Sequence, residues 1–320
     1  MDADAELVTI VIAAYRSQPD HLRMAVEGAL AQTWAAIEVL VCDDSPDDRL
    51  RALVDGFGDA RVAYRHNVPA LGVAANHWDA FERARGAFLV VLNHDDWIAP
   101  EFVERLLAPL RRDPSLVLAF CDHWVINGEG RRLEAETDGN SIRWGRAALA
   151  AGAHRPFVSL AAGQTIPLAM GCLMRRSALP REWPAAAGPA YDLWLAYLLA
   201  RHGGGAWFEK ARLSAWRSHD ANLTTAAGFD WLRGAAECWS AMAADPAFEA
   251  QREVVRTHAS GALRACASHA LARRRRADAR AWARASLAVA WTTKSALVWL
   301  LAALPERLST PMLRWRAVVR

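Results

Sequence analysis

The sequence predicts an α/β fold: a mostly parallel central sheet flanked by helices, followed by a helical C-terminal extension. Apolar segments alternate with segments of helical periodicity through the first 125 residues. Such alternation is typical of parallel sheets with right-handed crossovers. Two of the apolar segments end abruptly in paired carboxylates, Asp43-Asp44 and Asp95-Asp96. From residue 228 the composition changes to Ala, Arg and Trp, which favours several helices.

The strands expected in the first half are short, predominantly apolar runs, a pattern typical of strands buried on both faces. They cover residues 7–14, 37–42, 62–64, 87–92 and 116–121. Helices are expected where apolar side chains recur at helical spacing, at residues 21–32, 77–85 and 100–111.

The second half of the α/β region is less regular. Between Trp144 and Leu160 we expect a helix followed by a loop, then a strand at 169–176 and an amphipathic helix with Asp192 at its first turn. Two apolar segments then follow, at 206–208 and 213–216. The predicted organisation is one α/β domain and one extension. The domain spans residues 1–227, with a nucleotide-binding half (1–125) and an acceptor half (126–227), and the extension spans 228–320.

Composition narrows the class of protein. The chain has 320 residues, 53% of them hydrophobic, which is enough for a large domain with an extension. Its net charge of +3 gives no reason to expect nucleic-acid binding. The five cysteines are scattered without paired spacing, which predicts reduced thiols and a cytoplasmic location. The acidic start, residues 1–6, does not resemble a signal peptide.

The paired carboxylates Asp95 and Asp96 stand where an apolar strand leaves the sheet. Open α/β sheets bind ligands at the carboxyl ends of their strands. Carboxylate oxygens suit Mg²⁺ or Mn²⁺, with a diphosphate completing the coordination shell. The alternative is that one of the two caps the helix that opens near Pro100.

At this point the chain resembles the family-2 glycosyltransferases, which have the GT-A (Rossmann-like) fold. The resemblance is strong over the first 130 residues and only compositional after residue 230. The matching segments are Val11–Tyr15, Ala31–Trp34, Asp43–Ser45, Asn67, Gly72–Asn76 and Leu92–Trp97 with Pro100.

The resemblance implies roles for individual residues. The nucleotide-sugar would be bound by Ala13, Tyr15, Asp44, Gly72, Asn76, Asp95 and Arg217. A Mn²⁺ or Mg²⁺ cofactor would be held by Asp96 and His219, and Asp192 would be the catalytic base.

Each of these roles has a structural alternative, and the chain departs from the family pattern in places. Tyr15 could shield the sheet edge, Asp44 could serve a turn, and Asp192 could be a helix N-terminal acid favoured by the helix dipole. Asn93 stands where the family commonly has an acid, Ala75 replaces a basic residue, and Pro189-Ala190 replace Glu-Asp before the base.

Taken together, these residues imply an inverting, metal-dependent glycosyltransferase. It would move a sugar from a UDP- or dTDP-linked donor to a hydroxyl of a glycan or lipid-linked acceptor, as in cell-envelope polysaccharide biosynthesis. One alternative is a nucleotide-sugar-binding protein of the same fold without transferase activity. A dinucleotide oxidoreductase is disfavoured, because no Gly-x-Gly-x-x-Gly follows the first strand.

The C-terminal extension permits two interpretations. A basic run, Arg273–Arg276, precedes an apolar stretch at 281–304 that contains Trp282, Trp291 and Trp299. Lys294 and a Thr pair interrupt this stretch, so we do not expect a membrane-spanning helix. The helices either pack as ordinary structural elements or lie on a membrane surface, where Trp and Arg suit the headgroup layer. The second interpretation would put the protein at the inner face of the membrane.

Overall fold

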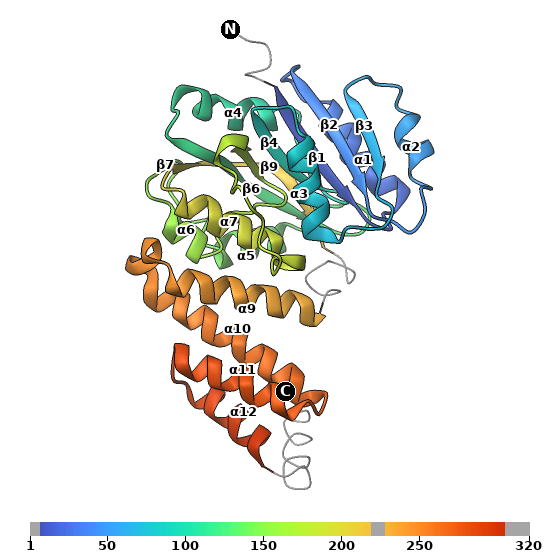
Figure 1. The fold of residues 1–320 in the computed structure, drawn as a ribbon. Coiled ribbons are helices and arrows are strands. Elements are labelled where there is room, and N and C mark those ends of the chain that lie inside the picture. Colours follow the sequence, from blue (N-terminus) through green and yellow to red (C-terminus); the bar gives the residue numbers. More distant parts are fainter. Residues whose placement is uncertain (1–6, 219–227, 305–320) are drawn as a thin grey trace. The chain divides into compact units, whose positions relative to one another are not determined.

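The computed structural model describes residues 7–218 and 228–304 (Figure 1). The chain divides into two compact units at residues 226 and 227, one residue from the boundary expected from composition. The units are described one at a time.

The first unit is built on a nine-stranded sheet in the order β3-β2-β1-β4-β8-β6-β9-β5, with β7 paired to β9. Helices lie on both faces of this sheet (Figure 1). The strands are β1 (Val8–Ala14), β2 (Ile37–Asp43), β3 (Val62–His66), β4 (Phe88–Asn93), β5 (Trp97–Ile98), β6 (Leu116–Ile126), β7 (Gly152–His154), β8 (Cys172–Arg175) and β9 (Gly205–Arg217). The helices are α1 (Pro19–Leu30), α2 (Arg51–Asp55), α3 (Val73–Arg83), α4 (Phe102–Arg112), α5 (Glu134–Arg143), α6 (Val158–Ala162) and α7 (Tyr191–Arg201).

The α/β prediction is confirmed. Strands β3, β2, β1 and β4 are parallel to one another, as expected. Beyond β4 the sheet is mixed, because β8 runs antiparallel to both β4 and β6, while β9 runs parallel to β6. Since β6 lies antiparallel to β8, which is antiparallel to β4, the carboxyl ends of β4, β6 and β9 meet at one edge.

One sequence-based expectation was wrong in the second half. The helix expected from Trp144 is absent: α5 ends one residue earlier, and Gly145, at φ +76°, breaks the chain direction after it. Acidic residues in the first turn of α5 and Arg143 in its last turn favour this placement through the helix dipole. The apolar segments 206–208 and 213–216 are parts of one continuous strand, β9, which pairs along β6 with register shifts.

A large apolar cluster holds β1 and β4 in place. Ile10 and Ile12 of β1 pack with Val26 of α1 and with Phe102 and Leu106 of α4, all at 0% exposure. Burying side chains of this size contributes about 1.5–3 kcal/mol each. The cluster therefore fixes the strands whose carboxyl ends carry Tyr15 and the acidic residues.

The strand register brings these carboxyl ends side by side. Ala13 pairs with Cys42 on one side and with Asn93 on the other. The Ala14 carbonyl accepts from the Asp44 N–H at 2.9 Å, and the Asp43 carbonyl accepts from the Asn67 N–H at 2.8 Å. Segments far apart in the chain thus meet at one edge, as parallel sheets require.

The second unit is helical. It comprises α9 (Gly228–Ala244), the short 3₁₀ helix η4 (Pro246–Gln251), α10 (Arg252–Ala272), α11 (Arg276–Val289) and α12 (Thr293–Ala303). Helices α10, α11 and α12 share one small apolar cluster that includes Leu271, Ala283 and Leu301. No described helix combines the length and the apolar character needed to cross a bilayer.

Candidate active site

The edge formed by the ends of β1 and β2 exposes apolar side chains. Tyr15 is 53% exposed, Val68 is 80% exposed and Leu71 is 43% exposed, although most large apolar residues of this unit are buried. The Arg16 N–H donates to Ser45 Oγ at 2.8 Å, which ties the turn after β1 to the turn after β2. An exposed aromatic ring between such residues can stack on a nucleobase, because every base has a π-face.

Asp44 holds the loop that borders this edge. Its carboxylate accepts from Asn67 Nδ2 at 2.8 Å, from the Leu71 N–H at 3.2 Å and from the Gly72 N–H at 2.7 Å. Gly72 has φ +86°, a conformation that favours glycine, and a Cβ added to it would meet no atom within 4 Å. The carboxylate is buried and engaged with the loop, so the contact of Asp44 with a base stays a prediction.

Asn76 also helps to hold this loop, through hydrogen bonds with Asn67 and with the end of β2. Its amide nitrogen donates to the Cys42 carbonyl at 2.9 Å, and its amide oxygen accepts from Asn67 Nδ2 at 2.9 Å. The side chain is 2% exposed. The structure therefore gives Asn76 the task of joining α3 to the end of β2, whereas the resemblance predicted direct contact with the nucleotide-sugar.

The acidic turn after β4 contains two carboxylates in different environments. Asp96 is 0% exposed: one carboxylate oxygen accepts from the Arg217 main-chain N–H at 2.8 Å, and the other from Asn93 Nδ2 at 2.8 Å. Burial, and then the neighbouring Asp95 carboxylate, raise the pKa of Asp96 well above its usual value. Asp95 is 8% exposed and lies nearer the surface.

Both oxygens of Asp96 accept a hydrogen bond from the protein, so Asp96 anchors the turn to β9. Because a carboxylate has about four lone-pair sites, these two hydrogen bonds are compatible with a bound cation. The role of Asp96 as a metal ligand therefore stays a prediction.

Arg217, predicted as a diphosphate ligand, is engaged with the protein itself, so its contact with a diphosphate stays a prediction. Its guanidinium donates to the Asp95 carbonyl at 2.9 Å and to the carbonyls of Asn127 and Gly128 at 3.0 and 2.7 Å. The residue is 2% exposed. Arg217 therefore joins the acidic turn to the turn after β6, and its donors point into main-chain carbonyls.

A divalent metal was expected here. His219, the second predicted ligand, lies outside the described residues. Within residues 7–218 and 228–304, no three His, Cys, Asp or Glu side chains are grouped as a metal site would need. Mg²⁺ and Mn²⁺ sites built with a nucleotide need one or two protein carboxylates, since phosphate oxygens and water supply the rest. A buried pair of carboxylates at a strand end fits that chemistry.

Asp192 begins α7 and accepts a hydrogen bond from the Leu193 N–H at 2.8 Å. Burial raises the pKa of its carboxyl group, which makes it a stronger base than an ordinary aspartate. Its neighbour Tyr191 connects this helix start to the acidic turn: the Tyr191 hydroxyl lies 3.4 Å from Asn93 Oδ1. Burial raises the pKa of Tyr191 well above its usual value, and the negative charges of Asp192, Asp96 and Asp95 add to this effect.

Tyr191 and His77 were not recognised from the sequence as parts of this site. The two rings stack with centroids 4.0 Å apart. His77 Nδ1 lies 2.7 Å from the Val73 carbonyl and must donate to it, and burial lowers the pKa of the imidazole to about 4. A neutral ring thus packs Tyr191 against α3. The available sequence signal was the adjacency of Tyr191 to Asp192 and of His77 to Asn76.

Asn93 has a chemical reason to be an amide. Because its nitrogen donates to Asp96, its oxygen is left to accept from Tyr191. An aspartate here could accept from Tyr191 but would place a second negative charge against Asp96. Asn93, which replaces the acid common in the family, therefore forms the middle of a Tyr191–Asn93–Asp96 hydrogen-bond chain.

We expect Asn93→Asp to lower the free energy of unfolding by about 1–3 kcal/mol, because Asp96 loses a donor and gains a like charge. Urea denaturation measures this change. Tyr191→Phe, which removes the weaker bond of the chain, should have a smaller effect. If Asn93→Asp keeps its stability and binds a nucleotide more tightly with Mn²⁺, position 93 is a metal position instead.

Two surface pockets lie outside this edge. The larger, of about 510 Å³, belongs to the first unit and is lined by residues of β6, α5 and β9, including Trp124, Ile142 and Lys210. Arg132 and Arg212 lie over the Trp124 ring at 4.2 and 4.7 Å from its centroid.

Asp122, a carboxylate that could also act as a base, lines this larger pocket. It accepts from Ser141 Oγ at 2.6 Å and from Arg146 Nε at 2.8 Å. Although burial opposes the change, these two hydrogen bonds lower its pKa. Asp122 is therefore a weaker base than Asp192.

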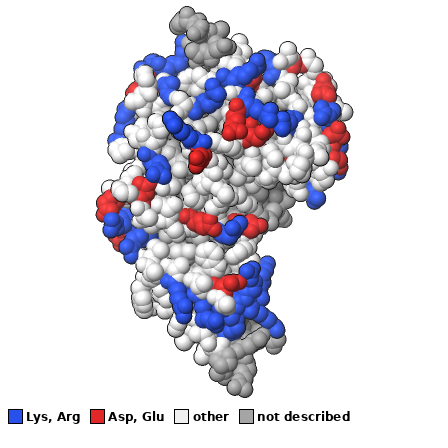
Figure 2. All heavy atoms as spheres, in the orientation of Figure 1, with Lys and Arg blue, Asp and Glu red and all other residues white. Residues whose placement is uncertain are grey.

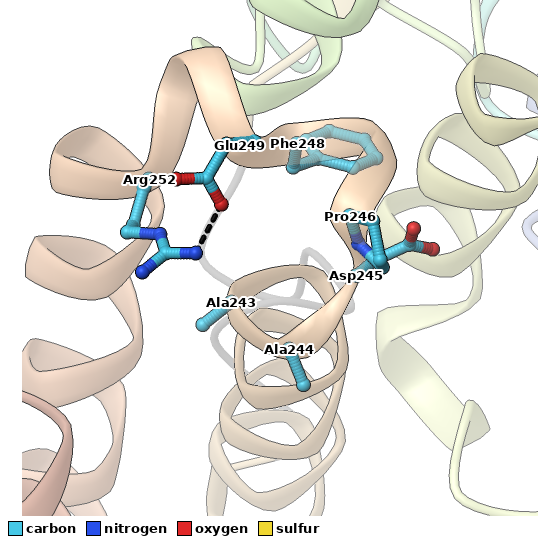
Figure 3. A pocket seen from close by; sticks show the side chains of 7 residues that line it. All are labelled: Ala243, Ala244, Asp245, Pro246, Phe248, Glu249 and Arg252. Atoms are coloured by element: carbon cyan, nitrogen blue, oxygen red, sulfur yellow. Dashed lines mark hydrogen bonds and ion pairs between the residues drawn. The ribbon is translucent and has the colours of Figure 1, made fainter.

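The smaller pocket, of about 240 Å³, belongs to the second unit and lies where α9 meets η4 (Figure 3). Its charged groups are already engaged. Asp245 accepts from the Ala247 N–H at 2.9 Å as the cap of η4, and Glu249 pairs with Arg252. This pocket offers no catalytic arrangement comparable to the edge of the sheet.

Comparisons with known proteins agree with this site. The model of the family described as Glycosyl transferase family 2 matches residues 9–161, which include Tyr15, Asp44 and the acidic turn. An Escherichia coli UDP-Glc:alpha-D-GlcNAc-diphosphoundecaprenol beta-1,3-glucosyltransferase, WfaP, is 33% identical over 102 residues, which are 32% of this chain and 40% of that protein. An Escherichia coli chondroitin synthase is 36% identical over 141 residues, which are 43% of this chain and 19% of that protein. The matches thus span less than half of these relatives.

Solved structures share the fold over most of the chain. Staphylococcus aureus TarS 1-349 in complex with UDP-GlcNAc has a TM-score of 0.60 at 13% identity, covering 94% of this chain and 82% of that one. The mannosyltransferase PcManGT from Pyrobaculum calidifontis, in complex with GDP-Man and Mn²⁺, has a TM-score of 0.57 at 16% identity, covering 97% and 83%. The sheet with its acidic strand end has the GT-A architecture, and residues 9–161 match the model of glycosyl transferase family 2.

Proposed function

We propose that the protein is an inverting, metal-dependent glycosyltransferase that moves a sugar from a nucleoside-diphosphate donor to a hydroxyl of a glycan or lipid-linked acceptor. The observation that carries the proposal is the convergence of three features at one sheet edge. These are the exposed Tyr15, the acidic turn with Asp95, and Asp192, whose neighbour Tyr191 lies 3.4 Å from Asn93.

Each residue then has a distinct task. Tyr15 stacks on the base, and the loop held by Asp44 encloses the nucleotide, with the Gly72 backbone close to the ligand. Asp192 accepts the proton of the acceptor hydroxyl as that oxygen attacks the anomeric carbon from the face opposite the leaving group. Holding both substrates in this geometry supplies much of the rate acceleration through proximity.

Asp96 and His219 would hold the Mn²⁺ or Mg²⁺ ion, and Asp95 would contact the metal or the ribose. When bound, such an ion neutralises charge on the departing diphosphate. A UDP-linked donor is supported by two similar proteins: WfaP is named as a UDP-Glc-dependent enzyme, and the TarS structure is a complex with UDP-GlcNAc. The name of WfaP also includes a diphosphoundecaprenol substrate, which supports a lipid-linked acceptor.

The larger pocket is our candidate for the acceptor. Ile142 in its lining is 69% exposed, so that the apolar face of a sugar ring could pack against it. This assignment puts the acceptor between β6, α5 and β9, within the half of the domain predicted for it.

We expect Asp95→Asn to abolish the part of UDP binding that depends on Mn²⁺ while preserving the fold. A ligand at about 100 times its Kd stabilises a protein by about 2.7 kcal/mol, so a thermal-shift assay with UDP, with and without Mn²⁺, measures the loss. Asp47→Asn is the matched control, since Asp47 is exposed and pairs with Arg49 at 2.7 Å. Mn²⁺-dependent binding at the wild-type level would remove Asp95 from the metal site.

The alternative function is binding of nucleotide-sugars without transfer, prompted by the replacement of Glu-Asp by Pro189-Ala190 before Asp192. A panel of nucleotide-sugars separates the two. Release of free UDP, or transfer to an added glycan in the presence of Mn²⁺, supports the enzyme. Donor binding without either reaction supports the binding protein.

A further inference from the structure

Basic side chains are concentrated in the last part of the second unit. Residues 254–304 contain nine Lys and Arg but one acidic residue, Asp278, whereas the whole chain contains 38 Lys and Arg and 35 Asp and Glu. Figure 2 shows blue side chains gathered over this unit. Asp278 is itself paired with Arg275 at 2.7 Å. This part of the chain is therefore strongly positive, and the remainder carries a net negative charge.

Some of these basic residues serve the fold. Arg276 donates to the carbonyls of Leu301 and Leu304, and Arg280 donates to the Ala302 carbonyl at 3.2 Å. They satisfy carbonyl groups at the end of α12 that lack partners within the helix. The positive charge of the other arginines is not explained in this way.

Three basic side chains have no such structural task. Arg273, Arg284 and Lys294 are exposed, and within the described part of the chain none of them has a hydrogen bond or an ion pair. They come from the end of α10, from α11 and from α12. Since these three helices pack on one shared apolar cluster, their outer faces adjoin one another.

Apolar side chains are exposed on the same group of helices. Trp291 is 71% exposed, Leu297 is 36% exposed and Leu300 is 49% exposed. Lys294, Leu297 and Leu300 follow each other at three-residue spacing and share one face of α12. Exposed apolar groups beside basic ones are typical of a surface that enters the headgroup layer of a membrane.

We propose that α11, α12 and the end of α10 form an attachment surface for an anionic lipid bilayer. Arg273, Arg284 and Lys294 contact lipid phosphates, and Trp291 and the two leucines enter the interface. The proposal adds a partner to the proposed function, since a lipid-linked acceptor would lie in the same bilayer, but the attachment needs no catalytic activity.

A bilayer fits this surface better than nucleic acid. Both partners attract basic side chains through phosphate groups. A bilayer also accepts exposed Trp and Leu side chains in an apolar layer, and that contribution is not screened by salt. The exposed leucines on the face of Lys294 have no corresponding use on a phosphate backbone.

The test is flotation of the full chain with vesicles. The protein should float with vesicles of phosphatidylcholine and phosphatidylglycerol and stay behind with phosphatidylcholine alone. The triple variant R273E/R284E/K294E should lose roughly a hundredfold or more in partitioning, because each basic residue near such a surface strengthens binding by roughly fivefold. A second variant, W291S/L297S/L300S, should lose the part of binding that survives high salt.

The matched control reverses the same number of charges in the first unit. R23E/R131E/R181E changes three exposed arginines and should float like wild type. An equal loss in this control would overturn the proposal, because net charge would then explain the result. The proposal would also be overturned if the wild-type protein did not bind anionic vesicles, or if it bound an oligonucleotide but not vesicles.

UDP binding separates this proposal from the proposed function. In the thermal-shift assay with Mn²⁺, R273E/R284E/K294E should respond to UDP as wild type does, which also shows that the variant is folded. If the wild-type protein floats but does not respond to any nucleotide-sugar, the proposed transferase function is wrong, whereas the proposed attachment surface is supported.

Discussion

Asp192→Asn is expected to lower the rate of sugar transfer by roughly 10²–10⁴-fold, with little change in donor affinity. Asparagine keeps the size of the side chain and its hydrogen bond from the Leu193 N–H, but it cannot accept a proton from the acceptor hydroxyl. Steady-state kinetics, which separates kcat from the donor KM, measures the effect.

The same substitution, which lowers the rate, should raise the stability of the folded protein at neutral pH. Because burial raises the pKa of Asp192 in the folded state, the folded protein binds more protons than the unfolded chain between the usual and the raised pKa. Stability therefore falls as pH rises through this window. Asp192→Asn lacks this penalty, so its Tm should exceed that of wild type at neutral pH, and the difference should vanish below both pKa values.

A matched control tests the competing role of Asp192 as a helix N-terminal acid. Asp20 occupies the first turn of α1, as Asp192 occupies that of α7. Asp20→Asn should lower stability slightly, by about 0.3–1 kcal/mol, and leave turnover unchanged. If Asp192→Asn behaves in the same way, with normal kcat, the base lies elsewhere.

Arg217→Ala should lower the free energy of unfolding by about 3–5 kcal/mol. The substitution leaves the carbonyls of Asp95, Asn127 and Gly128 without their donor in a region that is almost fully buried. Each unsatisfied buried group costs about 1–3 kcal/mol before relaxation. Urea denaturation measures the change.

The control for Arg217 is Arg176→Ala, which removes an exposed arginine and should stay within about 0.5 kcal/mol of wild type. The original expectation was that Arg217 pairs with a diphosphate oxygen. Were that correct, Arg217→Ala would unfold at the wild-type urea concentration and lose UDP affinity. That result would contradict the structural role inferred from its hydrogen bonds.

Local pattern was sufficient for the first half of the domain. Strands β1, β2 and β4 are predominantly apolar, so burial on both faces could be inferred without tertiary information, and the carboxylates that follow β2 and β4 indicated the ligand-binding edge. The change of composition near residue 228 likewise indicated the helical unit. These features depend on neighbours within a few residues, where strand and helix periodicity are visible in the sequence.

The roles of individual polar side chains were decided by tertiary structure. Arg217 was expected to face a ligand, but it contacts Asp95, 122 residues earlier in the chain. Asn93 was seen as a lost acid, but it links Asp96 to Tyr191, 98 residues later.

The sequence by itself thus determined the architecture of the parallel half, the edge where a ligand would bind and the residue types gathered there. Only the tertiary structure decided which of those side chains face outward and which satisfy the protein's own buried groups. The physical reason is that hydrogen-bonding capacity belongs to the residue type, whereas its partner is chosen by strands that meet only after folding. A buried N–H or carbonyl takes the nearest polar side chain, whatever function that side chain has in related proteins.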